Sequence, residues 1–267
     1  MRRKLKFRIA LYSILSISYT VNGQNFCDFI NKVQDYQQSV KINDSGDILK
    51  IDTSTFNTDF YIKLFDKLKV ASPLKCETIY LDYMLGGEPA LILFEDSLNI
   101  ENYIAKRVEN VTQDKNIDSE NVIRNALYEL SDSTKRIVNN IIYENNEDGI
   151  FQYLFFNQMG ENFALSWHSN YDEKYVLCSK KQLTHLIKPF LNNKLYTVER
   201  KSYKKLLKKN IEPQVQKVES NYIITWFVLK THKGIYKQTF AINDSNPYKI
   251  EKIKSEQVVK IDINFLY

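Results

Sequence analysis

The chain has 267 residues, 43% of them hydrophobic and 26% charged, which suits one large domain or two small ones with a buried core. Its net charge of +5 is carried by basic residues among the first eight, and the remainder holds 32 basic and 32 acidic residues. This balance excludes the strong basic bias of a dedicated nucleic-acid-binding protein, so we expect no nucleic-acid partner.

The N-terminus is predicted to be a cleavable signal peptide over residues 1–23. Five basic residues open it, and an apolar run over residues 9–19 follows. This run is shorter than the roughly 20 residues that a membrane-spanning helix needs. Val21 and Gly23 stand at the positions that signal peptidase reads before Gln24. We expect a protein that begins at Gln24, lacks a transmembrane segment after cleavage, and is periplasmic, envelope-associated or extracellular.

The remaining chain is divided by charge into an acidic and a basic region. Residues 24–150 hold 13 basic and 22 acidic residues, whereas residues 151–267 hold 19 and 10. This split favours either an anionic partner for the basic side or two regions that attract each other within one fold. We place the acidic region at 24–148 and the basic region at 149–267, and the two can form one domain.

In the acidic region, apolar side chains recur at helical spacing over residues 26–40 and 60–68 and predict two helices. Cap candidates precede the second helix at Asn57, Thr58 and Asp59. β-prone runs at 78–84 and 90–94, separated by adjacent glycines, predict a hairpin. Three more helical patterns follow, at residues 100–108, 122–130 and 137–141.

In the basic region, residues 151–156 and 162–168 are predicted to form a β-hairpin, and residues 174–178 a third strand. Ser179 and Gln182 have the spacing of a capping box and predict a helix through residue 191. An antiparallel meander is predicted from the runs at 221–230, 235–242, 248–253 and 257–263. The predicted class is α+β, with a helix-rich N-terminal part containing a β-hairpin and a mainly antiparallel, β-rich C-terminal part with one or two helices.

Three cysteines are an odd count in a compartment that permits disulfides, which predicts one bridge and one free thiol. Cys27 and Cys76 are the predicted pair, because both lie in the acidic region. Cys178 directly precedes the predicted cap Ser179. A thiol there either becomes reactive or packs as a small apolar side chain against Leu183. The packing interpretation is favoured.

Candidate catalytic residues lie between residues 166 and 173. Ser166 and His168 are predicted to share one face of a strand, as a nucleophile and its base. Asp172 and Glu173 can orient the histidine or act as acid and base. Side chains two apart on a strand are about 6.5–7 Å apart, too far for direct activation of Ser166. An exported hydrolase using His168 with Ser166, Asp172 or Glu173 is therefore the alternative function. The histidines are dispersed, so neither a metal site nor a cofactor is predicted.

The sharpest local feature is a run of basic residues interleaved with Tyr203, Leu206 and Leu207. Its cations are Arg200, Lys201, Lys204, Lys205, Lys208 and Lys209. Helical spacing places them around a narrow apolar stripe, where they can bind an acidic protein, an anionic glycan or a lipid surface, or cover the acidic region. The leading hypothesis is an exported, non-enzymatic protein that binds a macromolecular partner at the envelope or outside the cell.

Overall fold

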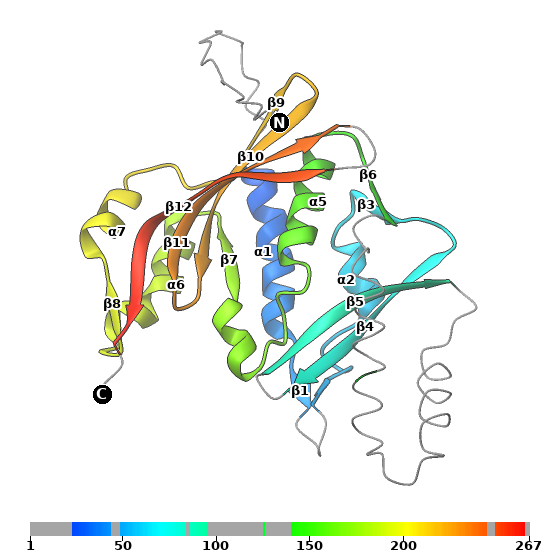
Figure 1. Cartoon of the computed structure of the whole chain (residues 1–267), viewed down its shortest axis with the longest axis horizontal. Helices are drawn as coiled ribbons and strands as arrows, with labels where there is room; N and C mark the ends of the chain where they lie inside the picture. The colour runs from blue at the N-terminus through cyan, green and yellow to red at the C-terminus, as the bar shows by residue number, and fades with distance from the viewer. Residues whose placement is uncertain are drawn as a thin grey trace, which may run out of the picture.

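The computed structural model describes residues 23–43, 49–83, 86–95, 125, 140–244 and 249–264 (Figure 1). Residues 1–22 of the predicted signal peptide and most of the helical patterns predicted between residues 100 and 141 lie outside the described residues. Helices and strands are mixed, and all pairs of described strands are antiparallel. The α+β class is therefore confirmed.

The centre of the fold is an antiparallel sheet that curls into half a barrel (Figure 1). Its strands are β7 (Lys174–Leu177), β8 (Tyr196–Val198), β9 (Gln214–Val218), β10 (Asn221–Lys230), β11 (Gly234–Asn243) and β12 (Ile250–Ile263). They lie in the order β7-β10-β11-β12-β8, and β9 also pairs with β10. The predicted meander is confirmed, except that the last two predicted strands form one long strand with two register shifts against β11.

Strand β10 explains how helices cover both faces of this sheet. Trp226 and Val228 point to one face and pack in the larger core, whereas Phe227 and Leu229 point to the other and pack in the smaller core. The larger core contains α1 (Gly23–Ser39) and α5 (Glu147–Met159), and the smaller core contains α6 (Lys180–Asn192) and α7 (Arg200–Leu206). A strand covered on both faces needs apolar side chains at consecutive positions.

Helix α5 corrects the sequence interpretation. Residues 151–156 and 162–168 do not form the predicted hairpin, because the first run lies within α5 and the second enters a 3-10 helix, η2 (Trp167–Asp172). All residues of Phe151–Phe156 are buried, since α1, β10 and their neighbours surround the helix. A helix that is apolar all round lacks the 3.6-residue periodicity by which helices are recognised. The basic region thus holds α5, α6, α7 and η2 instead of one or two helices.

The acidic region is less helical than predicted. Its described part contains α1, the short α2 (Thr58–Lys63) and six strands. The strands pair as β1 (Ile42–Asn43) with β2 (Lys50–Ile51), β3 (Leu68–Val70) with β6 (Ile141–Tyr143), and β4 (Leu74–Tyr83) with β5 (Gly86–Glu95). The last pair confirms the predicted hairpin, and the Asn57 side chain caps α2 by accepting from Phe60 N at 2.7 Å. The helix-rich description is therefore only partly supported.

The capping box of α6 is confirmed with one difference in its partners. Ser179 Oγ accepts from Gln182 N at 3.1 Å, while Gln182 Oε1 accepts from Cys178 N at 2.7 Å. The side chain of Cys178 packs in the larger core and that of Leu183 in the smaller core, so the predicted contact between them is not formed. The two faces of the sheet separate these neighbours.

The structure contains the three cysteines in their reduced form. Cys27 and Cys76 are not joined, and all three cysteines are free thiols. Helix α1 directs Cys27 towards the end of β7, where its Sγ lies 3.4 Å from the carbonyl oxygen of Cys178. Cys27 thus contacts Cys178 of the basic region, while other α1 side chains such as Tyr36 and Gln37 contact the acidic region.

The larger core crosses the predicted boundary at residue 148. The Phe26 and Phe151 ring centroids are 4.4 Å apart, and those of Phe151 and Trp226 are 5.9 Å apart. Phe29 on α1 lies 5.5 Å from Phe65 in the acidic region and 5.4 Å from Phe155 in the basic region. Aromatic contacts of this kind contribute about 0.5–1.5 kcal/mol each beyond the area they bury.

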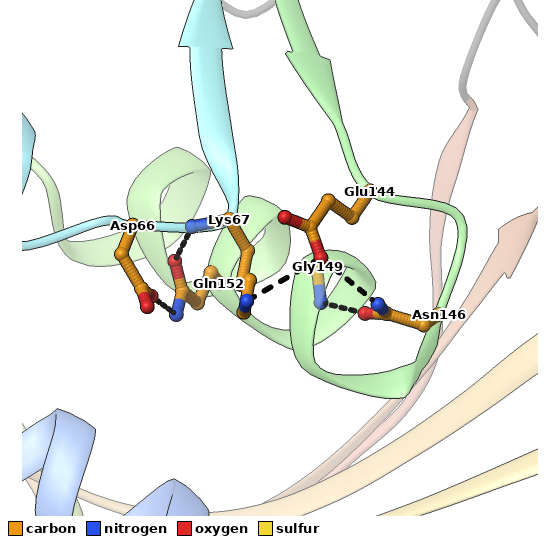
Figure 2. Close-up of polar contacts among 6 residues, drawn as sticks. All are labelled: Asp66, Lys67, Glu144, Asn146, Gly149 and Gln152. Carbon is orange, nitrogen blue, oxygen red and sulfur yellow. Dashed lines mark hydrogen bonds and ion pairs between the residues drawn. The ribbon is translucent and has the colours of Figure 1, made fainter.

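Polar contacts attach α5 to the acidic region (Figure 2). Gln152 Nε2 donates to Asp66 Oδ1 at 2.7 Å, and Gln152 Oε1 accepts from Lys67 N at 3.0 Å. Lys67 Nζ lies 3.4 Å from Glu144 Oε2, just before the helix. The one amide among the buried α5 side chains is therefore hydrogen-bonded at both its polar atoms, as its burial requires.

The backbones of Gly149 and Glu144 approach closely at the start of α5, and a substitution of Gly149 tests this approach. Asn146 Oδ1 caps the helix by accepting from Gly149 N at 2.8 Å (Figure 2), and a Cβ atom on Gly149 would lie 2.0 Å from the backbone oxygen of Glu144. We predict that Gly149→Ala lowers the free energy of unfolding by about 2 kcal/mol or more, measured by chemical denaturation. Asn157→Ala, at an exposed position of the same helix, is the control. Equal midpoints for the two variants would contradict the close approach.

Candidate functional site

Two of the predicted catalytic residues make structural contacts with other parts of the loop and hairpin. Ser166 Oγ accepts a hydrogen bond from Gly87 N at 2.7 Å, and Ser166 N donates to Gly87 O at 2.9 Å. The His168 ring lies between two aromatic rings, 4.8 Å from Trp167 and 5.2 Å from Tyr171. The serine thus fastens the loop to the β4–β5 hairpin, and the histidine belongs to an aromatic surface.

The two predicted carboxylates also have separate partners. Asp172 Oδ1 lies 2.6 Å from Lys233 Nζ, and this hydrogen bond holds the pKa of Asp172 below its ordinary value. Glu173 Oε1 accepts from Tyr175 OH at 2.6 Å. A general acid needs the opposite change, a raised pKa that keeps its proton at neutral pH. Asp172 is therefore unsuited to that role.

The strand predicted for residues 162–168 is absent because the backbone bends twice. Ala164 and Trp167 have φ angles of 51° and 47°, a region that non-glycine residues enter rarely. Tyr80 OH on β4 donates to the carbonyl oxygen of Ala164 at 2.7 Å. Such conformations persist only where the surroundings fix them, and here the hairpin supplies the fixing contacts.

The structure brings together a set of rings that sequence reasoning did not find, which we call the aromatic row. Its members are Trp167, His168, Tyr171, His232, Tyr196 and Phe190, with successive ring centroids 4.8 to 5.5 Å apart. Trp167 is 66% exposed and Tyr171 is 47% exposed. Large aromatic side chains on a rigid loop are common in binding surfaces. The sequence signal was the density of rings in the otherwise polar segment 167–171.

A substitution of Gly86 tests whether the β4–β5 hairpin holds the aromatic row in place. Its φ is 129°, and a Cβ atom there would lie 2.4 Å from the carbonyl oxygen of Ser166. We predict that Gly86→Ala costs about 2 kcal/mol or more of unfolding free energy and changes the accessibility of Trp167 to a fluorescence quencher. Glu88→Ala, at an exposed position of the same strand, should change neither. Unchanged quenching in Gly86→Ala would show that the loop is held by other contacts.

His232 gives the aromatic row a dependence on pH. Its Nδ1 lies 2.9 Å from Tyr196 OH, and burial lowers its pKa below the ordinary 6.5, against a smaller opposing effect of Glu173. A lowered pKa means that the folded state resists protonation more than the unfolded state does. Stability is therefore present above about pH 6.5 and is lost as the pH falls through the lowered pKa.

We predict that Tm falls between about pH 7 and pH 5 and that His232→Gln reduces this fall. Carboxylates also contribute to the fall in Tm at the lower end of this pH range. The effect of His232 is therefore taken from the difference in Tm between His232→Gln and the parent protein. His185→Gln, at an exposed position on α6, should leave the pH dependence unchanged. Parallel Tm profiles for the parent and His232→Gln would contradict the assignment.

A cavity of about 350 Å³ opens beside the same loop. It lies between α1 and the start of β7, and it is lined by residues that include Gln34, Gln37, Asn162 and Glu173. Gln34 Nε2 is buried there without a hydrogen-bond partner, whereas Gln37 Nε2 donates to the carbonyl oxygen of Met159 at 2.7 Å. Of the four predicted catalytic residues, only Glu173 lines this cavity. The others do not converge with it in this space.

The predicted basic segment forms the surface of α7 and the turn that follows it. We call its six cations, Arg200, Lys201, Lys204, Lys205, Lys208 and Lys209, the basic surface, and all six are exposed. Tyr203 and Leu206 are 8% and 2% exposed and anchor the helix in the smaller core. Within the described residues, none of the six cations makes an ion pair. Their charge is therefore directed to solvent and not to the described acidic region.

The remaining features concern metals and membranes. Across the described ranges, no group of three or more His, Cys, Asp or Glu side chains could hold a metal ion. The part of the chain described here also contains no helix that is both long and apolar enough to cross a bilayer.

Comparisons with family models, curated proteins and solved structures find no match to this chain.

Proposed function

We propose that this is an exported, non-enzymatic protein that binds an anionic glycan through its basic surface and its aromatic row. The observation that carries the proposal is a dense set of exposed cations without acidic partners among the described residues. Export rests on the predicted signal peptide, and the proposed location is the periplasm, the envelope or the outside of the cell.

Ion pairs on the strand next to α7 provide a comparison for the unpaired cations of the basic surface. On the neighbouring β12, Lys254 pairs with Glu256 at 2.7 Å and Lys260 pairs with Asp262 at 2.8 Å. Two of the three lysines of that strand are thus paired locally, whereas no cation of the basic surface has an ion pair among the described residues. Uncompensated charge on one surface attracts anions over a Debye length of about 8–10 Å.

The chemistry of the surface favours a glycan over a lipid bilayer or an acidic protein. A helix that lies in a bilayer buries its apolar face in lipid, but Tyr203 and Leu206 are already buried in the protein. Lysine ammonium groups are point charges on flexible stems, which suit sulfate or carboxylate groups spaced along a polymer. Sugar rings also have apolar faces that pack on aromatic side chains. The aromatic row supplies such side chains and includes Tyr196 on β8, the strand before α7.

The alternative of a hydrolase using Ser166, His168, Asp172 or Glu173 has less support. Ser166 is hydrogen-bonded to Gly87 and Asp172 is paired with Lys233, which lowers the pKa of Asp172. An active site needs a nucleophile, a base and a substrate position within hydrogen-bond reach of one another. The contacts of these residues favour binding by the loop over catalysis on it.

Reversal of charge on α7 tests the proposal. We predict that Lys204→Glu, Lys205→Glu and Lys208→Glu together weaken binding to a sulfated polysaccharide by about tenfold or more, and remove most of its salt dependence. Tm should change little, because exposed charge pairs contribute only about 0–1 kcal/mol each. Binding is measured by titration calorimetry at two salt concentrations.

The matched control reverses three exposed lysines of the acidic region, Lys32, Lys63 and Lys69, for the same change in net charge. It should retain most of the binding. Unfolding of the α7 variant, together with loss of stability of the parent in salt, would instead show that α7 holds the two regions together. Binding of the parent to anionic vesicles but not to the polysaccharide would replace the glycan by a lipid surface.

A further inference from the structure

Two cysteines far apart in the sequence meet inside the fold. Cys27 lies on α1, and Cys178 lies 151 positions later, between β7 and α6. The Cys27 Sγ donates to the carbonyl oxygen of Cys178 at 3.4 Å, and both side chains pack against the larger core. A hydrogen bond with the Cys27 side chain, together with burial, raises the pKa of the Cys178 thiol above its ordinary value. Figure 1 shows α1 beside β7, the strand that ends just before Cys178.

We propose that Cys27 and Cys178 form a disulfide bond when the chain enters an oxidising compartment. The inference rests on export, which is part of the proposed function, but not on the identity of the ligand. It makes the bridge a modification that marks the exported form, because thiols are kept reduced in most cytoplasms.

The third cysteine is the one left free. Cys76 lies on β4, and its nearest described hydrogen-bond acceptor is the adjacent Glu77 O at 4.0 Å. Burial, with a smaller contribution from the negative charge of Asp59, raises the pKa of Cys76 to about 12. The pKa of Cys178 is raised as well, so it is the proximity of Cys178 to Cys27, and not the acidity of either thiol, that selects this pair.

Formation of the bridge follows ordinary thiol–disulfide exchange with a disulfide donor such as oxidised glutathione. Cys27 is the more accessible thiol, since Cys178 is 2% exposed. The Cys27 thiolate attacks one sulfur of the donor, forms a mixed disulfide and releases one glutathione thiolate. Cys178 then loses its proton and attacks the Cys27 sulfur, which releases the second glutathione. Two protein thiols are oxidised, one donor disulfide is reduced, and both protons end on glutathione.

The bridge would attach α1 covalently to the end of β7, the first strand in the order of the sheet. It closes a loop of 151 residue steps, and cross-links over long loops remove much of the conformational freedom of the unfolded chain. Before export, α1 would be held by packing alone and the chain would unfold more readily. Oxidation therefore stabilises the fold after translocation, when unfolding is no longer required.

Peptide mapping of the exported full chain under non-reducing conditions tests the inference, with free thiols alkylated before digestion. The expected result is a peptide containing Cys27 joined to one containing Cys178, with a mass two hydrogens below their sum, and alkylated Cys76. Intact mass should place the N-terminus at Gln24. A bridge that includes Cys76, or three alkylated thiols after incubation with oxidised glutathione, would overturn the pairing.

Stability measurements keep the test independent of the mapping. Reduction, Cys27→Ala and Cys178→Ala should each lower the Tm of the oxidised protein by about 10 °C, whereas Cys76→Ala should remain sensitive to reduction. Cys27→Ala removes a less buried side chain and remains informative if Cys178→Ala does not fold. A Tm of the parent that ignores reduction would contradict the bridge. Glycan binding is measured on the reduced protein as well, so failure of the bridge and failure of the binding proposal are distinguished.

Discussion

The enclosure of α5 on every side is the constraint on which the rest of the structure depends. A helix with a continuous apolar surface has to be surrounded, and α1, β10 and the α2–β3 segment supply the surrounding side chains. Phe151 and Phe155 contact Phe29 on one side and Trp226 on the other. The acidic and basic regions are joined through this helix, because neither alone provides enough surface to cover it.

Elements with strong local signals were predicted well from the sequence. The cap of α6 depends on residues three apart, and β10 to β12 depend on β-prone runs and on a turn at Gly234. The error at α5 has the opposite cause. Its sequence shows only that consecutive residues are apolar. Over a short run, a buried strand and a buried helix have the same apolar pattern. Gln152 makes its hydrogen bonds with another segment, whereas the cap Asn146 is a local signal that the sequence interpretation did not use.

The candidate site was predictable only where one segment makes it. The basic surface lies on a single helix and its turn, so helical spacing identified both its cations and its apolar anchors. The aromatic row draws on η2, the β10–β11 turn, β8 and α6, and no local pattern connects these segments. The proximity of Cys27 to Cys178 was missed for the same reason, since contacts between segments far apart in the sequence are decided by packing.

The tip of the β4–β5 hairpin holds the loop that carries Trp167 and Tyr171, although hairpin and loop belong to different regions of the chain. The backbone at Gly86 and Gly87 packs closely on its neighbours. A side chain at Gly86 would overlap with Ser166 of the loop, and one at Gly87 would overlap with Tyr80. A chain cut near residue 148 would therefore yield two fragments without an ordered aromatic row, even if each collapsed. The rings of the loop can change without altering this backbone contact, whereas the two glycines that position the loop cannot be replaced without displacing their neighbours.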